Sequence, residues 1–207
     1  MIAHRFYNFS CWMVLRETEF DKVLLQLDKR QDSFLNPQEF SISPTVLKPA
    51  GTINAKITIT AYISANCSLC KKVVIPLYMA VTSGPIEKKA VLNLKPILPN
   101  ISNMALLAAQ KMGKFWEYYH SLEKEEKRLD EKILVSKAKK LKLPVEEFKK
   151  MLYDEESKKI IEGYKAEAIK NGITITPTLF INNRRYSSYK DPQWIIDLVE
   201  YEYEKVK

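Results

Sequence analysis

The sequence predicts an α/β fold in which a helical block separates the two halves of one β-sheet. Three observations support this fold class. A β-branched run over residues 56–63 leads into two cysteines and a helical pattern, and a second apolar strand pattern follows. Almost all of residues 102–170 has the apolar spacing of amphipathic helices. The C-terminal part then contains two short strand patterns, joined by an Asn-Asn turn, and a last helix.

The first half of the sheet is predicted as a strand–helix–strand unit. We expect a buried strand at residues 56–63, a helix at 67–83 and a second strand at 89–98. Pro76 lies inside this helix, where its missing N–H removes one backbone hydrogen bond and predicts a kink. Two strands that are joined by a helical crossover run parallel as a rule, so we expect the same here.

The helical block is predicted as four helices. The first begins at a cap on Ser102 or Asn103, and its apolar stripe continues to Tyr119. The second starts near Asp130, and the other two cover residues 145–153 and 155–170. The Asn-Gly pair at 171–172 ends the last one, because glycine adopts the left-handed conformation just past a helix without strain.

The C-terminal part is predicted as a hairpin and a helix. We expect a strand at residues 178–181 and a return strand at 184–187. Between them, Asn182 and Asn183 tolerate positive φ and suit a tight turn. An Asp-Pro pair at 191–192 is a strong start signal for the last helix, since it combines a capping side chain with proline at the first helical position.

The domain organisation follows from these elements. Residues 1–50 are expected to form an N-terminal helix and linker, and residues 51–207 the main domain, with 101–171 as its inserted helical subdomain. The apolar spacing in residues 19–30 predicts an amphipathic helix that packs on the domain or, alternatively, joins two copies into a homodimer. No run approaches the ~20 apolar residues of a transmembrane helix. The first apolar run is also too short for a complete signal peptide, so we expect an ordinary N-terminus or a truncated leader.

Charge excludes some classes of function. The net charge is +8, but charge alone reports attraction to acidic surfaces rather than a specific activity. From residue 124 to residue 170, glutamates alternate with lysines in the manner of solvated helix faces. The sequence has no aromatic platform for bases and no phosphate-binding loop, so we expect no nucleic-acid partner.

The strand at 56–63 ends directly before a CxxC motif, Cys67-Ser68-Leu69-Cys70. Its position on the first turn of a helix favours a thiolate, because helix N-termini present free N–H groups and a positive dipole end. The thiolate is the form that attacks disulfides, so this placement indicates redox chemistry. The two lysines that follow, Lys71 and Lys72, either add positive potential at the site or, in the interpretation we favour, are solvated helix residues with a small effect.

A metal site is the competing interpretation of the CxxC motif. A structural zinc site needs four nitrogen or sulfur ligands, and only Cys11, His4 and His120 are available to complete one. No second CxxC exists, so we expect neither a metal nor another cofactor. A purely structural disulfide is also disfavoured, because the loop it would close is very short. We interpret Cys11 as a lone thiol and His120 as a packed or surface residue.

Three stretches resemble one protein family. They are the strand and CxxC segment ITITAYISANCSLCKK, the segment AAQKMGKFWEYYHSL at residues 108–122, and GITITPTLFINNRRY at residues 172–186. Together with the element order, they resemble the thioredoxin fold and, within it, the DsbA branch with its helical insertion between the two halves of the sheet. The resemblance covers roughly residues 51–200.

The resemblance implies a site and a set of partners. It implies a cis bond between Thr176 and Pro177, in a loop beside the cysteines that pairs with the substrate backbone. We assign substrate binding to this pair and to Ser68 and Leu69 between the cysteines. From its place at the helix start, Cys67 is expected to be the attacking thiolate, and the buried Cys70 is expected to resolve the mixed disulfide.

We therefore expect a DsbA-like oxidoreductase that acts on protein thiols and disulfides and is recycled by a separate redox partner. Its location is expected to be periplasmic or otherwise extracytoplasmic, because disulfides persist in such compartments. The alternatives are a cytoplasmic reductase, a disulfide isomerase, which would need a dimer, and a non-catalytic interaction module of the same fold. The Ser-Leu dipeptide stands where strongly oxidising members have Pro-His, so the direction of exchange stays open.

Overall fold

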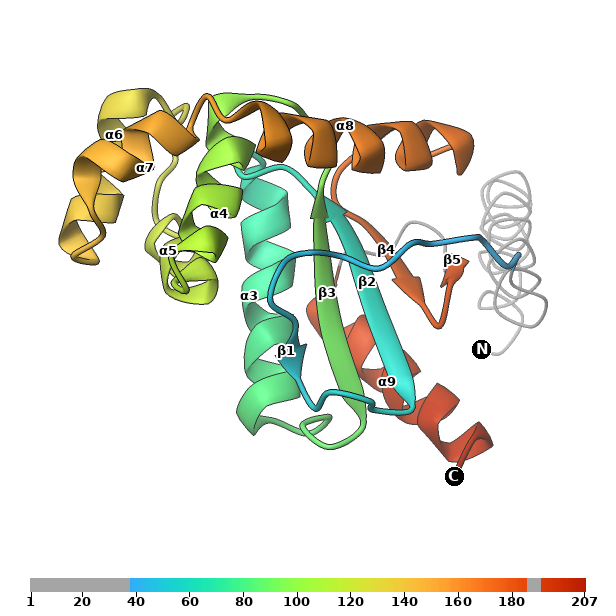
Figure 1. The fold of residues 1–207 in the computed structure, drawn as a ribbon. Coiled ribbons are helices and arrows are strands. Elements are labelled where there is room, and N and C mark those ends of the chain that lie inside the picture. Colours follow the sequence, from blue (N-terminus) through green and yellow to red (C-terminus); the bar gives the residue numbers. More distant parts are fainter. Residues whose placement is uncertain (1–37, 186–190) are drawn as a thin grey trace, which may run out of the picture. The chain divides into compact units, whose positions relative to one another are not determined.

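The fold is described from a computed structural model that describes residues 38–185 and 191–207. The chain divides into two compact units, residues 1–38 and residues 39–207. The second unit contains every element named below (Figure 1). The helix predicted at residues 19–30, the dimer contact it could form, and Cys11 and His4 lie outside the described residues.

A five-stranded sheet forms the centre of this unit. In space its strands follow the order β1-β3-β2-β4-β5. β2 and β3 are parallel, and every other neighbouring pair is antiparallel. The strands span Ala50–Gly51 (β1), Ile57–Ile63 (β2), Ala90–Pro96 (β3), Thr178–Ile181 (β4) and Arg184–Arg185 (β5). This arrangement confirms the predicted α/β thioredoxin fold, with β-α-β before the helical block and β-β-α after it.

Helices cover the central strand on both faces. Helix α3, Ser68–Ser83, joins β2 to β3 and packs against the last helix, α9, Pro192–Lys205 (Figure 1). A cluster of buried side chains lies where helix α8, Glu155–Lys170, meets the sheet. It includes Tyr62, Tyr164 and Phe180. Successive strand residues point to opposite faces, so burial of all of Ala61, Tyr62 and Ile63 requires both layers.

The helical block contains one more helix than the four predicted. The described elements are α4 (Ile101–Lys111), α5 (Phe115–Ser121), α6 (Glu131–Lys140), α7 (Val145–Met151) and α8. The predicted first helix is interrupted at Gly113, which adopts a φ of +71° and ends α4 in a turn. Its cap is also different from the prediction: the Asn100 side chain accepts a hydrogen bond from the Asn103 N–H at 3.1 Å.

The C-terminal hairpin and helix agree with the prediction over the described residues. Asn182 and Asn183 have φ values of 48° and 63°, the left-handed conformations that a tight hairpin turn requires. Asp191 caps α9, since its side chain accepts a hydrogen bond from the Gln193 N–H at 3.0 Å. The rest of the predicted return strand, beyond residue 185, lies outside the described residues.

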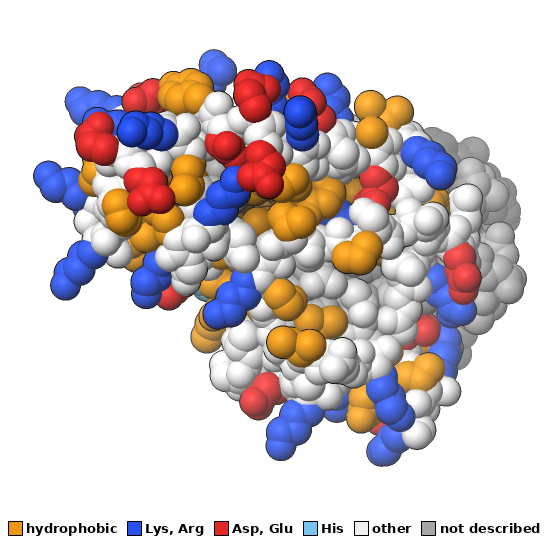
Figure 2. Space-filling model, in the orientation of Figure 1, with side chains coloured by type: hydrophobic (Ala, Val, Ile, Leu, Met, Phe, Trp, Pro, Cys, Tyr) orange, Lys and Arg blue, Asp and Glu red, His pale blue; other side chains and the backbone are white. Residues whose placement is uncertain are grey.

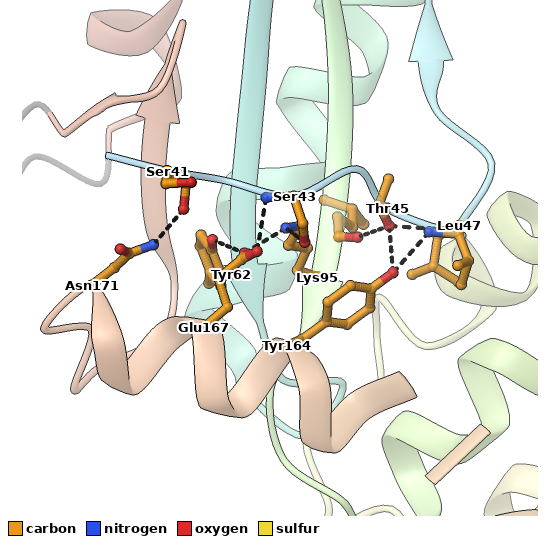
Figure 3. Close-up of polar contacts among 11 residues, drawn as sticks. Ser41, Ser43, Thr45, Leu47, Tyr62, Lys95, Tyr164, Glu167 and Asn171 are labelled. Carbon is orange, nitrogen blue, oxygen red and sulfur yellow. Dashed lines mark hydrogen bonds and ion pairs between the residues drawn. The ribbon is translucent and has the colours of Figure 1, made fainter. Parts of the chain in front are cut away.

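Residues 39–49, which the sequence predicts as a linker, pack onto the domain as an extended strap (Figure 3). The Ser43 N–H donates to Glu167 at 2.8 Å, and the Val46 N–H donates to the Tyr164 hydroxyl at 2.8 Å. Beneath the strap, the side chain of Lys95 is 1% exposed, and its ammonium donates to Glu167 and, at 3.0 Å, to the Ser43 hydroxyl. A buried charge pair therefore fastens the strap to α8 and β3.

Lysines and glutamates of the helical block lie side by side on the surface. On the face shown in Figure 2, acidic and basic side chains are mixed rather than gathered by sign. Several are paired one turn apart, including Lys149 with Glu146 and Lys158 with Glu155. This mixing is typical of solvated helix faces. Among the helices of the described residues, none is both long and apolar enough to cross a bilayer.

Candidate active site

The CxxC motif lies where strand β2 turns into helix α3. Cys67 is the N-cap residue of α3, with extended backbone angles of −80° and 110°. Its sulfur accepts a hydrogen bond from the Cys70 N–H at 3.2 Å, and its own N–H donates to the Ser64 carbonyl at 3.0 Å. One of the first N–H groups of the helix, that of Cys70, thus points at the Cys67 sulfur, and the start of a helix is where a thiolate is stabilised.

The two cysteines differ in exposure. Both are free thiols, Cys67 half-buried and Cys70 with an exposed fraction of 0%. Burial raises the pKa of the Cys70 thiol, and its hydrogen bond with Cys67 raises it further. Cys70 is therefore a protonated, inaccessible thiol in this state, whereas Cys67 can be reached from solvent.

The Thr176–Pro177 loop lies against Cys67. The peptide bond between these two residues is cis. The Cys67 thiol donates to the Thr176 carbonyl oxygen, with 3.5 Å between sulfur and oxygen. This contact follows from the strand register, because Thr178 at the start of β4 pairs with Tyr62 near the end of β2. Sheet pairing therefore brings the predicted loop to the start of α3.

The remaining predicted site residues lie on the surface around this contact. Ser68 is exposed, and Leu69 is 38% exposed although it is apolar. On the other side, Ile175 directly precedes Thr176 and is 53% exposed. Cys67 is thus flanked by uncovered apolar side chains from two segments that are distant in sequence. Such a surface suits an extended polypeptide better than a small polar ligand.

Helix α4 and the α5–α6 connection hold the turn that precedes Cys67. The buried Asn103 of α4 accepts a hydrogen bond from the Ala65 N–H at 2.8 Å and donates to the Leu98 carbonyl at 2.8 Å. The side chain of Asn66 accepts a hydrogen bond from the Leu129 N–H at 2.9 Å. The helical insertion therefore supports the site directly, a role that the sequence pattern does not reveal.

Lys71 contradicts the sequence interpretation of a solvated residue. It is 4% exposed, and its ammonium donates to the carbonyls of Leu122, at 3.1 Å, and Glu125. Lys72 is exposed, as expected. A pocket of about 450 Å³ lies between this part of α3 and Glu123–Glu126. The difference arises from tertiary packing, because the α5–α6 connection covers Lys71 and leaves Lys72 exposed.

Two buried hydroxyls near the cysteines, those of Tyr119 and Ser64, have no hydrogen-bond partner among residues 38–185 and 191–207. Burial raises the pKa of Tyr119 well above its usual value, and the charges of Cys70 and Cys67 raise it further. Tyr119 and its neighbours Trp116 and Tyr118 are core residues. His120 packs its ring against Tyr78, with 4.5 Å between centroids.

Metal ligands are not gathered at this site. Over residues 38–185 and 191–207, no group of three or more His, Cys, Asp or Glu side chains could hold an ion. The zinc interpretation also named Cys11 and His4, which lie outside that part of the chain. What the described site offers is a pair of thiols, one accessible and one buried, beside the Thr176 carbonyl.

Comparison with known proteins identifies a family for this chain. The family model described as thioredoxin matches residues 47–200. No curated protein sequence matches the chain.

Solved structures share the fold at low sequence identity. Oxidised BdbD from Bacillus subtilis is 20% identical, with a TM-score of 0.66 over 81% of this chain and 99% of that one. The catalytic domain of Proteus mirabilis ScsC is 18% identical, with a TM-score of 0.64 over 86% and 97%. The thiol-disulfide exchange protein α-DsbA2 from Wolbachia pipientis is 13% identical, with a TM-score of 0.62 over 87% and 94%. At these identities the likeness establishes the fold.

Proposed function

Because this chain belongs to the thioredoxin family, we propose that it is a DsbA-like thiol–disulfide oxidoreductase acting on protein thiols and disulfides. Cys67 is the nucleophile and Cys70 the resolving thiol, and Thr176, Pro177, Ser68 and Leu69 are the substrate-binding residues. One observation carries this proposal. The accessible sulfur at the start of α3 contacts the Thr176 carbonyl, while the second thiol is buried one helical turn away.

The geometry supports exchange in two steps. The Cys67 thiolate attacks one sulfur of a substrate disulfide, which forms a mixed disulfide and releases the other substrate sulfur as a thiolate. Cys70 then loses its proton and attacks the Cys67 sulfur, which releases the second substrate thiolate and leaves a Cys67–Cys70 disulfide. Two electrons pass from the protein to the substrate. Run backwards, the same steps oxidise a substrate dithiol and leave both cysteines reduced.

The surroundings of the cysteines divide these roles. The Cys70 N–H stabilises negative charge on the Cys67 sulfur, as required of an attacking or leaving thiolate. The Thr176 carbonyl faces the same sulfur, so a substrate strand laid along the loop would bring its disulfide to Cys67. A separate redox partner recycles the CxxC pair, and the activity belongs to an oxidising, extracytoplasmic compartment where substrate disulfides persist.

Single cysteine variants test this proposal. Cys67→Ser is expected to abolish disulfide exchange with a model protein substrate, whereas Cys70→Ser is expected to accumulate mixed disulfides that mass spectrometry detects. Cys11→Ser is the matched control and should retain activity. Full exchange activity in Cys67→Ser would overturn the assignment. The equilibrium with glutathione then gives the direction, since ~−120 mV marks an oxidant and ~−270 mV a reductant.

A further inference from the structure

Strands β2 and β3 separate just before the CxxC motif, and the side chain of Asn103 bridges them at this point. The last residues that the two strands pair are Ile63 and Pro96. Two residues further along each strand, the Ala65 N–H donates to the Asn103 side-chain oxygen at 2.8 Å, and the Asn103 amide donates to the Leu98 carbonyl at 2.8 Å. A carboxamide has an acceptor and a donor, as a backbone peptide group has. It therefore continues the hydrogen bonding between β2 and β3 by one step.

Ala65 belongs to the tight turn that leads into Cys67. A hydrogen bond from the Cys67 N–H to the Ser64 carbonyl, at 3.0 Å, closes this turn, so Ala65 and Asn66 are its two central residues. Each central residue is bound to a different part of the helical insertion. The Ala65 N–H is bound to Asn103 of α4, and the Asn66 side chain is bound to the α5–α6 connection. The position of Cys67 thus depends on α4 as well as on β2.

The carboxamide of Asn103 is itself held in one place. Asn103 has an exposed fraction of 0%, and both ends of its side chain are hydrogen-bonded, as burial of a polar group requires. Its own N–H donates to the side chain of Asn100, the cap of α4, at 3.1 Å. The residue therefore lies on a fixed first turn of a helix, and groups on such rigid elements position a site more precisely than groups on loops.

We propose that Asn103 is a positioning residue of the redox site, which fixes the turn before Cys67 so that the Cys67 sulfur faces the Thr176 carbonyl. This proposal rests on the proposed function of Cys67 and of the Thr176–Pro177 loop. The sulfur and the carbonyl oxygen are 3.5 Å apart. A bound peptide has to meet both groups at once, so a small displacement of the turn slows its exchange. A small disulfide needs only the sulfur, so its reaction changes little.

Two disulfide reagents with the same leaving group measure this positioning. In a background with Cys11→Ser and Cys70→Ser, Cys67 is the single cysteine of the chain. One reagent is dithiobis(nitrobenzoate), and the other is a peptide whose cysteine is joined to one thionitrobenzoate group by a disulfide. The Cys67 thiolate attacks either disulfide, forms a new disulfide bond and releases the coloured thionitrobenzoate anion. Dividing the peptide rate constant by that of the small reagent gives a ratio that reports on peptide alignment.

Replacing Asn103 should lower this ratio. In Asn103→Ala, we expect the ratio to fall about tenfold, with the rate for the small reagent within about twofold of the background, because the turn loses its tie to α4. Asn103→Asp should restore most of the ratio, since it keeps an oxygen for the Ala65 N–H. The Leu98 carbonyl still accepts from the Asn100 N–H at 2.8 Å in that variant. An unchanged ratio in Asn103→Ala would overturn the proposal.

Asn171 provides the matched control. It is 9% exposed, and its amide donates to the Ser41 carbonyl at 3.1 Å, in the strap rather than at the redox site. Asn171→Ala therefore removes a comparable hydrogen bond, and it should lower the free energy of unfolding while the ratio stays the same. An equal fall of the ratio in Asn171→Ala and Asn103→Ala would mean that Asn103 acts only through overall stability, and this result would also overturn the proposal.

The test does not depend on the folding of one variant. If Asn103→Ala does not fold, Asn103→Ser replaces it with the same expected fall, because the smaller side chain admits a water that satisfies the Ala65 N–H without fixing it. Failure of this proposal is also distinct from failure of the proposed function. If the wild-type protein exchanges no disulfides with a protein substrate, the proposed function is wrong. If exchange is normal and depends on Cys67 but the ratio does not fall, only the role of Asn103 is wrong.

Discussion

The thiol of Cys67 and the carbonyl of Thr176 are 3.5 Å apart, although 109 positions separate them in the sequence. The contact exists because β4 pairs with β2, and this pairing brings the loop before β4 to the start of α3. One partner is an accessible sulfur and the other a backbone acceptor. The site therefore brings an accessible thiol and a backbone carbonyl together, and the position of both depends on the central sheet.

The buried thiol of Cys70 predicts a loss of stability at high pH in the reduced protein. Burial raises its pKa from 9.0 to about 12, so between these values the unfolded chain loses the proton and the folded chain keeps it. Unfolding is then favoured as pH rises, by up to ~1.4 kcal/mol per pH unit. Urea denaturation of reduced protein from pH 8 to 10.5 measures this slope.

The variant Cys70→Ala is the reference for that measurement. It lacks the titrating thiol of Cys70 but keeps the lysines and tyrosines that titrate in the same pH range. We expect its stability to fall less steeply with pH than that of the wild type. Equal slopes would show that Cys70 does not stay protonated in the folded state.

The pair formed by Lys95 and Glu167 predicts a large effect on stability. Lys95→Met leaves a carboxylate that is 14% exposed without its ammonium partner. We expect a loss of roughly 2–4 kcal/mol in the free energy of unfolding, just below the range for a fully buried pair. Lys111→Met, in a pair that is 33% exposed on the lysine side, should cost less than ~1 kcal/mol.

Replacing both members of the buried pair tests the cause. In Lys95→Met with Glu167→Met, no uncompensated charge remains, so part of the lost stability should return. Urea denaturation of the two single variants and the double variant gives the coupling energy. Strictly additive losses would mean that the two side chains act independently.

The unpaired hydroxyl of Tyr119 predicts that its removal is harmless. Tyr119→Phe deletes a buried hydroxyl without a partner, so the free energy of unfolding should stay unchanged or rise by up to ~1 kcal/mol. Tyr118→Phe is the matched control, since that hydroxyl donates to the Leu134 carbonyl at 3.1 Å. It should cost about 0.5–1.5 kcal/mol. A clear loss in Tyr119→Phe would reveal a partner for its hydroxyl.

The cap of helix α8 predicts a loss of stability in acid. Hydrogen bonds from the Ser157 side chain and from Lys111, and then from the Ser157 N–H, lower the pKa of Asp154 to about 2. The unfolded chain takes up the proton at higher pH, near 3.8, so the stabilisation is present above that pH and disappears as pH falls toward 2. Asp154→Asn keeps a capping side chain without the titration.

Thermal melting between pH 2 and pH 6 distinguishes the two proteins. The wild type should lose its advantage in thermal stability over Asp154→Asn as pH falls. The variant has no carboxylate at this cap, so its stability should lack the part that depends on the protonation of Asp154. At pH 6, Asp154→Ala is expected to cost about 1 kcal/mol, the usual effect of a lost helix cap. Parallel melting curves for wild type and Asp154→Asn would contradict the assigned role.

The sequence by itself determined the features that depend on near neighbours. The CxxC motif at the boundary of β2 and α3, the Asn182-Asn183 turn and the Asp191 cap each form from a few consecutive residues. Their hydrogen bonds close within one turn, so residue type and spacing are enough to predict them. The parallel pairing of β2 with β3 also followed, because a helix joins the two strands and such crossovers connect parallel strands.

Only the tertiary structure decided what happens to side chains that other segments cover. Lys71 and Lys72 are identical in type and adjacent, and the α5–α6 connection buries one of them and not the other. Lys95 is buried because the strap and α8 enclose it. Long side chains can lie in water or inside the protein. The choice depends on packing between segments that are distant in sequence, which local patterns do not encode.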